Sequence, residues 1–247
     1  MGSEMCIRDR VKTGVSPSLH PAVISSIHGY EQNKGYCGGA EEAFNIAYKT
    51  VEDVIATRKT VQVDESRTPK AKALAVANKA EQYLARLQKT HGAAWERLDN
   101  GIKHIETLLS APLEQQAGAG SVNGEIRSHA KSLKRDERMR MIEDALKRGD
   151  VKTCGAILGA PAYLSGLNDE EHKHFTRKFH EATNPELVSR LNVITQVKQK
   201  LEQSKDIIKM ELERAVGLSP IELQRLREGS KAAEDALLLK DFAPAQN

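Results

Sequence analysis

The sequence is poor in aromatic residues and contains no long apolar run. Aromatic residues make up 4% of the chain and hydrophobic residues 39%, against 29% charged residues. This composition is typical of a helical protein with a large surface, and it disfavours a compact domain with an aromatic core. Because no apolar run approaches the roughly 18 residues that a membrane span requires, we expect no membrane association.

The chain also lacks a strong excess of either charge and has little cysteine. Its 37 basic and 34 acidic residues leave a formal net charge of +3. Proteins that bind nucleic acid usually carry a clearer basic excess, so composition alone does not favour that partner. Cys37 and Cys154 are far apart in the sequence, and two distant thiols form no disulfide framework, which favours a reducing compartment.

The first ten residues are treated as a separate segment. The tract Met5-Cys6-Ile7-Arg8-Asp9-Arg10 resembles the in-frame translation of a transposon adapter used to prepare sequencing libraries, which often opens translated metagenomic sequences. On this interpretation residues 1–10 are a sequencing artefact. Cys6 is then no cysteine of the natural protein, and we expect the true N-terminus, with any targeting signal, to be missing.

The most clearly marked element is a long helix over residues 185–216. Asn184 is a good N-cap, a proline occupies the first helical position, and Gly217 can adopt the left-handed conformation that ends a helix. Between these ends, apolar residues recur with the heptad spacing of a coiled-coil seam. We expect a helix–helix interface at Leu187, Leu191, Ile194, Leu201, Ile208 and Leu212. Lys198 and Lys205 fall on the same seam and would leave a monomeric stripe poorly filled, which favours self-association.

A second heptad pattern predicts a helix from Pro69 to Leu109, which begins with a threonine cap followed by proline. The glycines within residues 91–92 and 99–101 can each end a helix or form a turn. Two or three shorter helices are therefore the alternative to one long, kinked helix.

Composition and capping signals divide the chain and predict an all-α fold, namely an elongated helical bundle or coiled coil with a small inserted module of short helices. Residues 111–124 are rich in Ala, Gly, Gln and Ser and are predicted to form a flexible linker. The other expected parts are a loosely ordered N-terminal segment (11–39), a helical region (40–110), the module (125–182), the long helix plus a C-terminal helix (183–240) and a frayed tail (241–247).

An apolar loop lies inside the module, in the tract Ile157-Leu158-Gly159-Ala160-Pro161-Ala162-Tyr163-Leu164-Ser165-Gly166-Leu167. We expect Tyr163, Leu164 and Leu167 to fold back onto the module's core, with contact to a partner as the alternative. In this tract and its flanking helices the chain is similar to uncharacterised helical proteins of phage and prophage genomes. The resemblance covers about a quarter of the chain. It implies a phage-encoded virion or assembly component, and it assigns no functional residue.

Candidate chemical sites are few. Cys37 precedes a predicted helix, where a thiol can be activated, but no matching histidine signature accompanies it, so we interpret it as a loop cysteine. Glu171 and His174 share a helical face, yet di-iron bundles need this pair on two helices. No phosphate-binding glycine loop, metalloprotease motif or nucleophile elbow is present. The sequence therefore predicts no enzyme activity, no metal and no cofactor.

The functional prediction is a non-enzymatic structural or assembly protein, phage-associated, that acts through helix–helix interfaces. Its expected partner is a second copy or another helical protein, in the host cytoplasm or in a virion. The alternative is a nucleic-acid-associated regulator that uses the basic surface of residues 127–148, with candidate contacts at Arg127, Lys131, Lys134, Arg135 and Arg138. Residues 125–150 contain eight basic and six acidic residues, a net charge of +2, which is typical of a mixed, ion-paired surface.

Overall fold

A computed structural model describes residues 14–113 and 121–238 of the chain. All regular structure in these residues is helical, which confirms the predicted all-α class. The α-helices are α2 (Ala22–Ser25), α3 (Tyr30–Asn33), α4 (Ala40–Gln62), α5 (Pro69–Leu109), α6 (Ser121–Ser132), α7 (Arg135–Lys147), α8 (Val151–Leu158), α9 (Asp169–Thr183), α10 (Pro185–Val216) and α11 (Pro220–Leu238). Short 3₁₀ helices are η1 (Pro17–Leu19), η2 (Lys34–Tyr36) and η4 (Ala162–Leu164).

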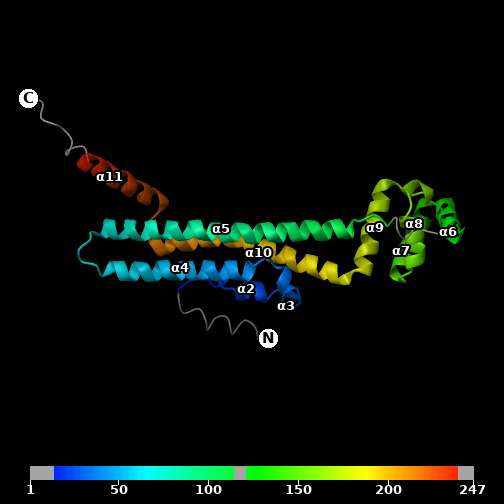
Figure 1. Ribbon diagram of the computed structural model, residues 1–247, viewed down its shortest axis with the longest axis horizontal. Coiled ribbons are helices and arrows are strands. Elements are labelled where there is room, and N and C mark those ends of the chain that lie inside the picture. Colours follow the sequence, from blue (N-terminus) through cyan, green and yellow to red (C-terminus); the bar gives the residue numbers. More distant parts are fainter. Residues whose placement is uncertain (1–13, 114–120, 239–247) are drawn as a thin grey trace, which may run out of the picture. The chain divides into compact units, whose positions relative to one another are not determined.

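The chain divides into two compact units. The first unit consists of the residues up to Leu98 together with those from Gln196 onward, and the second unit is Asp99–Thr195. Each boundary falls inside a long helix, so α5 and α10, labelled in Figure 1, each contribute residues to both units.

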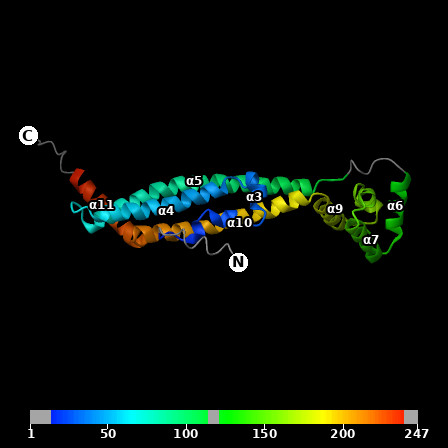
Figure 2. The ribbon, with the colours of Figure 1, turned by 90° about the horizontal axis from the view of Figure 1, so that it is seen from below.

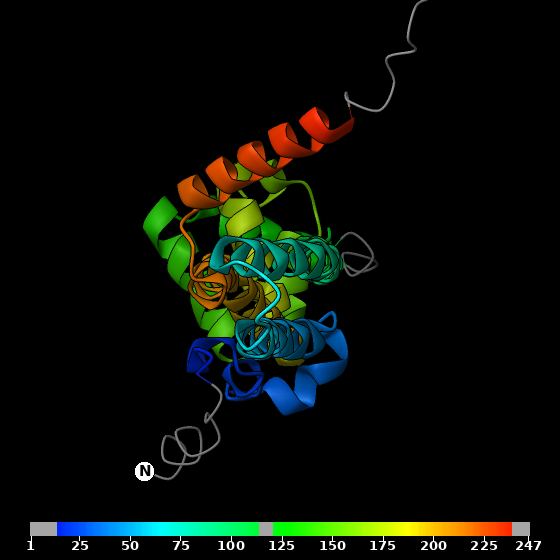
Figure 3. The same cartoon turned by 90° about the vertical axis from the view of Figure 1, so that its left-hand side faces the viewer.

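Three helices form the body of the first unit. Figures 1 and 2 show α4 running beside α5 and α10, and Figure 3 looks along their length. Their facing sides supply a core of mostly small and branched apolar residues that includes Ala47, Val51, Val54, Ala77, Ala80, Leu87, Ile208, Leu212 and Ala215. Alanine at so many contact positions lets the helix backbones approach one another closely.

The long helix α5 is uninterrupted from Pro69 to Leu109, so the alternative of several shorter helices is wrong. His91 is buried in the first unit, and its burial favours continuation of the helix through the adjacent glycine. A buried face can outweigh the weak helix propensity of a single glycine, which costs about 1 kcal/mol relative to alanine.

The N-terminal segment is more ordered than its composition predicts. Residues 14–39 form short helices, and their apolar side chains, including Val15, Leu19, Ile24 and Tyr30, are buried. The Tyr30 hydroxyl donates a hydrogen bond to the Glu41 carboxylate at 3.0 Å. These tertiary contacts stabilise a segment whose local sequence alone favours no particular structure. Residues 11–13 lie outside the described residues.

The second unit has its own core. Helices α6, α7, α8 and α9 enclose a cluster that includes Ile142, Ile157, Leu158, Phe175 and Phe179. The predicted linker is shorter than expected, because α6 already begins at Ser121 and its buried residue Ala130 packs into this cluster. Packing of an apolar face can stabilise a helix through residues of low propensity. Residues 114–120 of the predicted linker lie outside the described residues.

The apolar loop of the module folds back only in part. Leu167 is buried, as predicted, whereas Tyr163 is 67% exposed and Leu164 is also exposed, so their predicted place in the core is wrong. The Ser165 hydroxyl donates a hydrogen bond to the Ile157 carbonyl at 3.0 Å, and Gly166 has a left-handed φ of 74°. The hydrogen bond and the left-handed turn redirect the chain, so that Leu167 reaches the core while Tyr163 and Leu164 stay at the surface.

Candidate functional sites

Five of the six predicted interface residues are buried within this chain. Leu191, Ile194, Leu201, Ile208 and Leu212 are buried, and Leu187 is half-buried. Their burial therefore requires no second copy.

The two seam lysines are accommodated without a partner chain. The ammonium group of Lys198 lies 4.3 Å from the centre of the Trp95 ring, which is a cation–π contact. Lys205 is exposed, and its ammonium forms an ion pair with Glu202 at 2.8 Å. Both lysine ammonium groups therefore have a partner within the same chain. The expectation that these lysines leave the seam of a monomer poorly filled is not met, because a long lysine side chain can keep its charged end near the surface.

Three of the five candidate residues on the predicted basic surface form hydrogen bonds within the chain. Arg127 Nη1 donates a hydrogen bond to the Ala156 carbonyl at 3.2 Å. The buried Arg138 donates from Nη1 to the carbonyls of Ala130 and Leu133, both at 3.4 Å.

Of the remaining candidates, Arg135 Nε lies 2.6 Å from Glu171 Oε1, and this hydrogen bond lowers the pKa of the glutamate. Lys131 and Lys134 are exposed. A phosphate track requires several available cations, and Arg127, Arg135 and Arg138 are committed to carbonyls or to a carboxylate.

Two histidines of the second unit donate hydrogen bonds to backbone carbonyls. His172 Nε2 lies 2.8 Å from the Leu158 carbonyl, and His180 Nε2 lies 2.7 Å from the Ala111 carbonyl. Because a carbonyl only accepts, each ring nitrogen carries its proton toward the backbone. The described residues contain no group of three or more His, Cys, Asp or Glu side chains arranged to hold a metal ion.

Cys37 has the environment of a structural thiol. It is buried, its Sγ donates to the Asn33 carbonyl at 3.3 Å, and burial raises its pKa to about 11. A nucleophilic cysteine requires the thiolate, which such burial disfavours at neutral pH.

An apolar groove on the first unit, named here the α11 groove, is lined by α5, α10 and α11. Its volume is about 350 Å³. The apolar lining residues are Ala77, Ala80, Leu84, Leu212, Val216, Leu218, Pro220 and Leu223, and the polar ones are Glu81, Gln88, Lys209 and Glu213. The heptad pattern predicts an apolar face on the helix from Pro69 to Leu109 but cannot show that a groove lies beside this face.

Helix α11 is attached to the first unit near its start and carries exposed apolar residues along its length. Arg227 Nη1 forms an ion pair with Glu81 Oε1 at 2.6 Å, and Nη2 donates to Asn78 at 3.3 Å. Figures 1 and 3 show α11 running in a different direction from α10. Ile221 is 66% exposed and Leu237 is 72% exposed.

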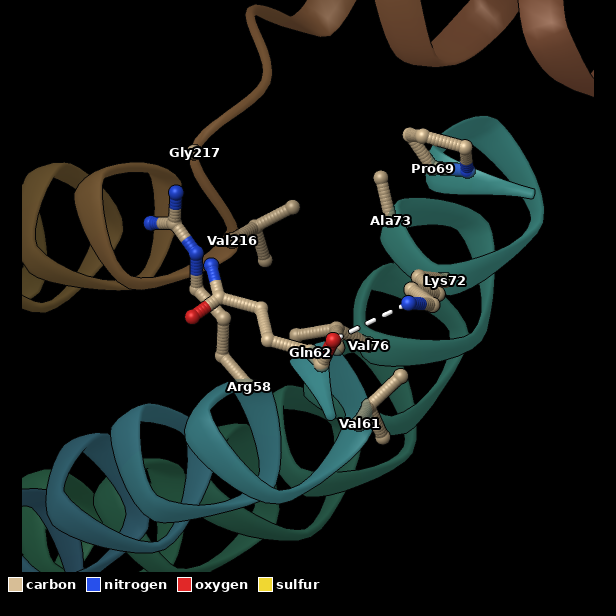
Figure 4. Close-up of a pocket in the computed structure, with 9 residues that line it drawn as sticks. All are labelled: Arg58, Val61, Gln62, Pro69, Lys72, Ala73, Val76, Val216 and Gly217. Atoms are coloured by element: carbon tan, nitrogen blue, oxygen red, sulfur yellow. Dashed lines mark hydrogen bonds between the residues drawn. The ribbon is translucent and has the colours of Figure 1, made fainter. Parts of the chain in front are cut away.

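A second cavity, named here the Arg58 cavity, lies where α4 ends, α5 begins and α10 ends (Figure 4). Its volume is about 300 Å³. The lining residues are Arg58, Val61, Gln62, Pro69, Lys72, Ala73, Val76, Val216 and Gly217. It therefore combines apolar walls with two cationic side chains and no carboxylate.

No helix in the described residues is both long and apolar enough to cross a membrane. No protein-family model, curated protein or solved structure matches this chain.

Proposed function

We propose that the protein is a non-enzymatic structural or assembly protein that self-associates through the α11 groove and the exposed face of α11. The observation that carries the proposal is an unfilled apolar groove beside a helix whose own apolar face is incompletely covered. The phage-associated setting, in a host cytoplasm or a virion, is proposed from the resemblance of residues 157–167 alone.

The apolar stripe of α11 continues from the groove toward the end of the helix. Leu223 lines the groove, and Leu226, Ser230, Ala233 and Leu237 follow it at alternating three- and four-residue steps. Side chains with this spacing lie on one helical face. Leu226 and Ser230 are half-buried, whereas Ala233 and Leu237 are exposed. The distal half of α11 therefore presents an exposed apolar face of the kind that docks into an apolar groove.

A second copy is the partner that fits this geometry, because one chain supplies both the groove and the stripe. An exchange of the two between copies is an isologous contact, which closes as a dimer. The charges also match, since the groove carries Glu213 and Lys209 while the distal part of α11 carries Lys231 and Glu234. Opposite charges at the rim favour one register of docking.

The test is the solution mass of the full chain, measured by light scattering over a range of concentrations. The wild type is expected to form a dimer of the 27.3 kDa chain. Leu237→Glu on the stripe and Leu84→Glu in the groove should each shift the equilibrium to monomer, because each buries an unpaired charge on docking. Met210→Glu is the matched control, since Met210 is 67% exposed on α10 and does not line the groove. A wild-type chain that stays monomeric at high concentration would refute the proposal.

A further inference from the structure

We propose that the Arg58 cavity binds a small carboxylate that carries an apolar body. This inference is independent of self-association. It rests on the shape of the cavity, the chemistry of its walls and the bonding of its two cations.

The walls of the cavity are apolar and come from three helices. Val61 lies in the last turn of α4, Ala73 and Val76 lie in the first two turns of α5, and Val216 is the last residue of α10. In Figure 4, Val216 and Ala73 flank the same space from opposite sides. A volume of about 300 Å³ accommodates about ten non-hydrogen atoms, if each takes the ~30 Å³ of a water molecule. The apolar body of the ligand is therefore a short branched alkyl group or a single ring.

The two cations of the cavity contact neutral acceptors. Arg58 Nη1 donates to the carbonyls of Arg214 and Ala215, both at 3.3 Å. Lys72 Nζ donates to the Gln62 carbonyl at 2.9 Å, drawn as a dashed line in Figure 4. Among the described residues, neither cation forms an ion pair with a carboxylate.

Asp64, an acidic group whose pKa Lys72 influences, is already engaged elsewhere. Asp64 accepts hydrogen bonds from the backbone and hydroxyl of Ser66, and it forms an ion pair with Arg67 at 3.2 Å. These hydrogen bonds, with smaller contributions from Arg67 and Lys72, lower the pKa of Asp64. The charges of Arg58 and Lys72 therefore remain available to an anion, and an anion between them gains charge-assisted hydrogen bonds.

Gly217 gives Arg58 its position. This glycine has a left-handed φ of 75°, and a Cβ at this position would lie 2.5 Å from the guanidinium of Arg58. The missing side chain therefore leaves room for the guanidinium at the end of α10. There Arg58 also stabilises the carbonyls that have no partner within the helix.

Two kinds of ligand carry such a carboxylate next to an apolar body, namely a free small acid and the C-terminus of a peptide. The two probes are 4-methylpentanoate and an N-acetylated tripeptide that ends in leucine. Each is compared by titration calorimetry with its neutral amide. We expect saturable binding of at least one acid by the full chain and none of its amide. Binding of the free acid alone assigns the site to a small molecule, and tighter binding of the peptide assigns it to a protein C-terminus.

Three variants test where the acid binds. Lys72→Gln removes one cation and keeps the cavity, and Ala73→Leu fills the cavity and keeps both cations. Lys72→Gln should weaken binding about tenfold or more, since a hydrogen bond to a charged group contributes about 1.5–3 kcal/mol. Ala73→Leu should weaken it to a similar extent, because the larger side chain occupies the space of the ligand's apolar body. Lys59→Gln is the matched control, because Lys59 is an exposed neighbour of Arg58 that does not line this cavity. Unchanged binding in both test variants, or no binding of either acid by the wild type, would overturn the proposal.

Discussion

At the scale of single residues, His91 is a buried base with one hydrogen bond. Its Nε2 lies 3.1 Å from the Ser204 hydroxyl, which donates its own proton to the Leu201 carbonyl at 2.7 Å. Nε2 therefore carries the proton of the imidazole, and Nδ1 has no hydrogen-bond partner among the described residues. Protonation would place a charge beside this unpartnered atom, and burial, assisted by the charge of Lys205, lowers the pKa of His91 to about 4.

This geometry predicts that the first unit loses stability as the pH falls from about 6.5 toward 4. In this interval the unfolded chain takes up a proton at residue 91, with an ordinary pKa near 6.5, while the folded chain does not. The contribution of His91 to the free energy of unfolding is constant above pH 6.5, decreases by about 3 kcal/mol over the interval and levels off below it. Urea unfolding at several pH values measures the change.

His91→Leu should abolish this part of the pH dependence, because leucine has no proton to bind. His104→Gln is the control, since His104 is an exposed histidine. If the unfolding free energy changes between pH 7 and pH 4.5 by the same amount in the wild type and in His91→Leu, His91 is not the source of the pH dependence.

At the scale of helices, the seam of α10 stabilises the fold of the single chain. Leu201 is fully buried, and Leu201→Ala should cost about 2–5 kcal/mol of unfolding free energy through lost burial and a residual cavity. Thermal unfolding measures the loss, and light scattering on the folded variant should return the wild-type mass. Met210→Ala, on the exposed side of the same helix, should change stability by no more than about 0.5 kcal/mol. If Leu201→Ala changes the mass and leaves the stability intact, the seam is an interface between copies after all.

The ends of the helices were predictable because their signals are local. The Ser219 hydroxyl and backbone amide both donate to the Glu222 carboxylate, at 2.7 and 2.9 Å, and these contacts between residues three apart form a capping box. The cap of α9 is of the same kind, with Asn168 Oδ1 accepting from the Glu171 backbone at 2.8 Å. Each such contact joins residues within one turn, so the sequence pattern contains the whole interaction.

The candidate sites were not predictable, because they depend on contacts between distant segments. Arg58 reaches the carbonyls of Arg214 and Ala215, which are more than 150 positions away in the chain. A heptad pattern shows that one face of a helix is buried but does not show against which helix. The same pattern fits an internal bundle and an assembly between copies, which is why the seam of α10 was predicted as an interface.

At the scale of the whole molecule, each of the two units contains a cluster of buried apolar side chains of its own. One lies among α4, α5 and α10 and includes Ile208, and the other lies among α6, α7, α8 and α9 and includes Phe175. Each core buries its own branched or aromatic side chains. We therefore expect the two units to open as separate cooperative units.

Hydrogen exchange measured by mass spectrometry tests this independence. Phe175→Ala should cost the second unit about 3–5 kcal/mol and speed amide exchange in α7 and α8, while α4 keeps its wild-type protection. Ile208→Ala is the reciprocal variant, since Ile208 is buried in the other core, and it should speed exchange in α4 and leave α8 unchanged. Helices α5 and α10 contribute to both units, so their end segments should follow the unit to which each belongs. If either substitution accelerates exchange equally in α4 and α8, the chain unfolds as one cooperative body and the two cores are not independent.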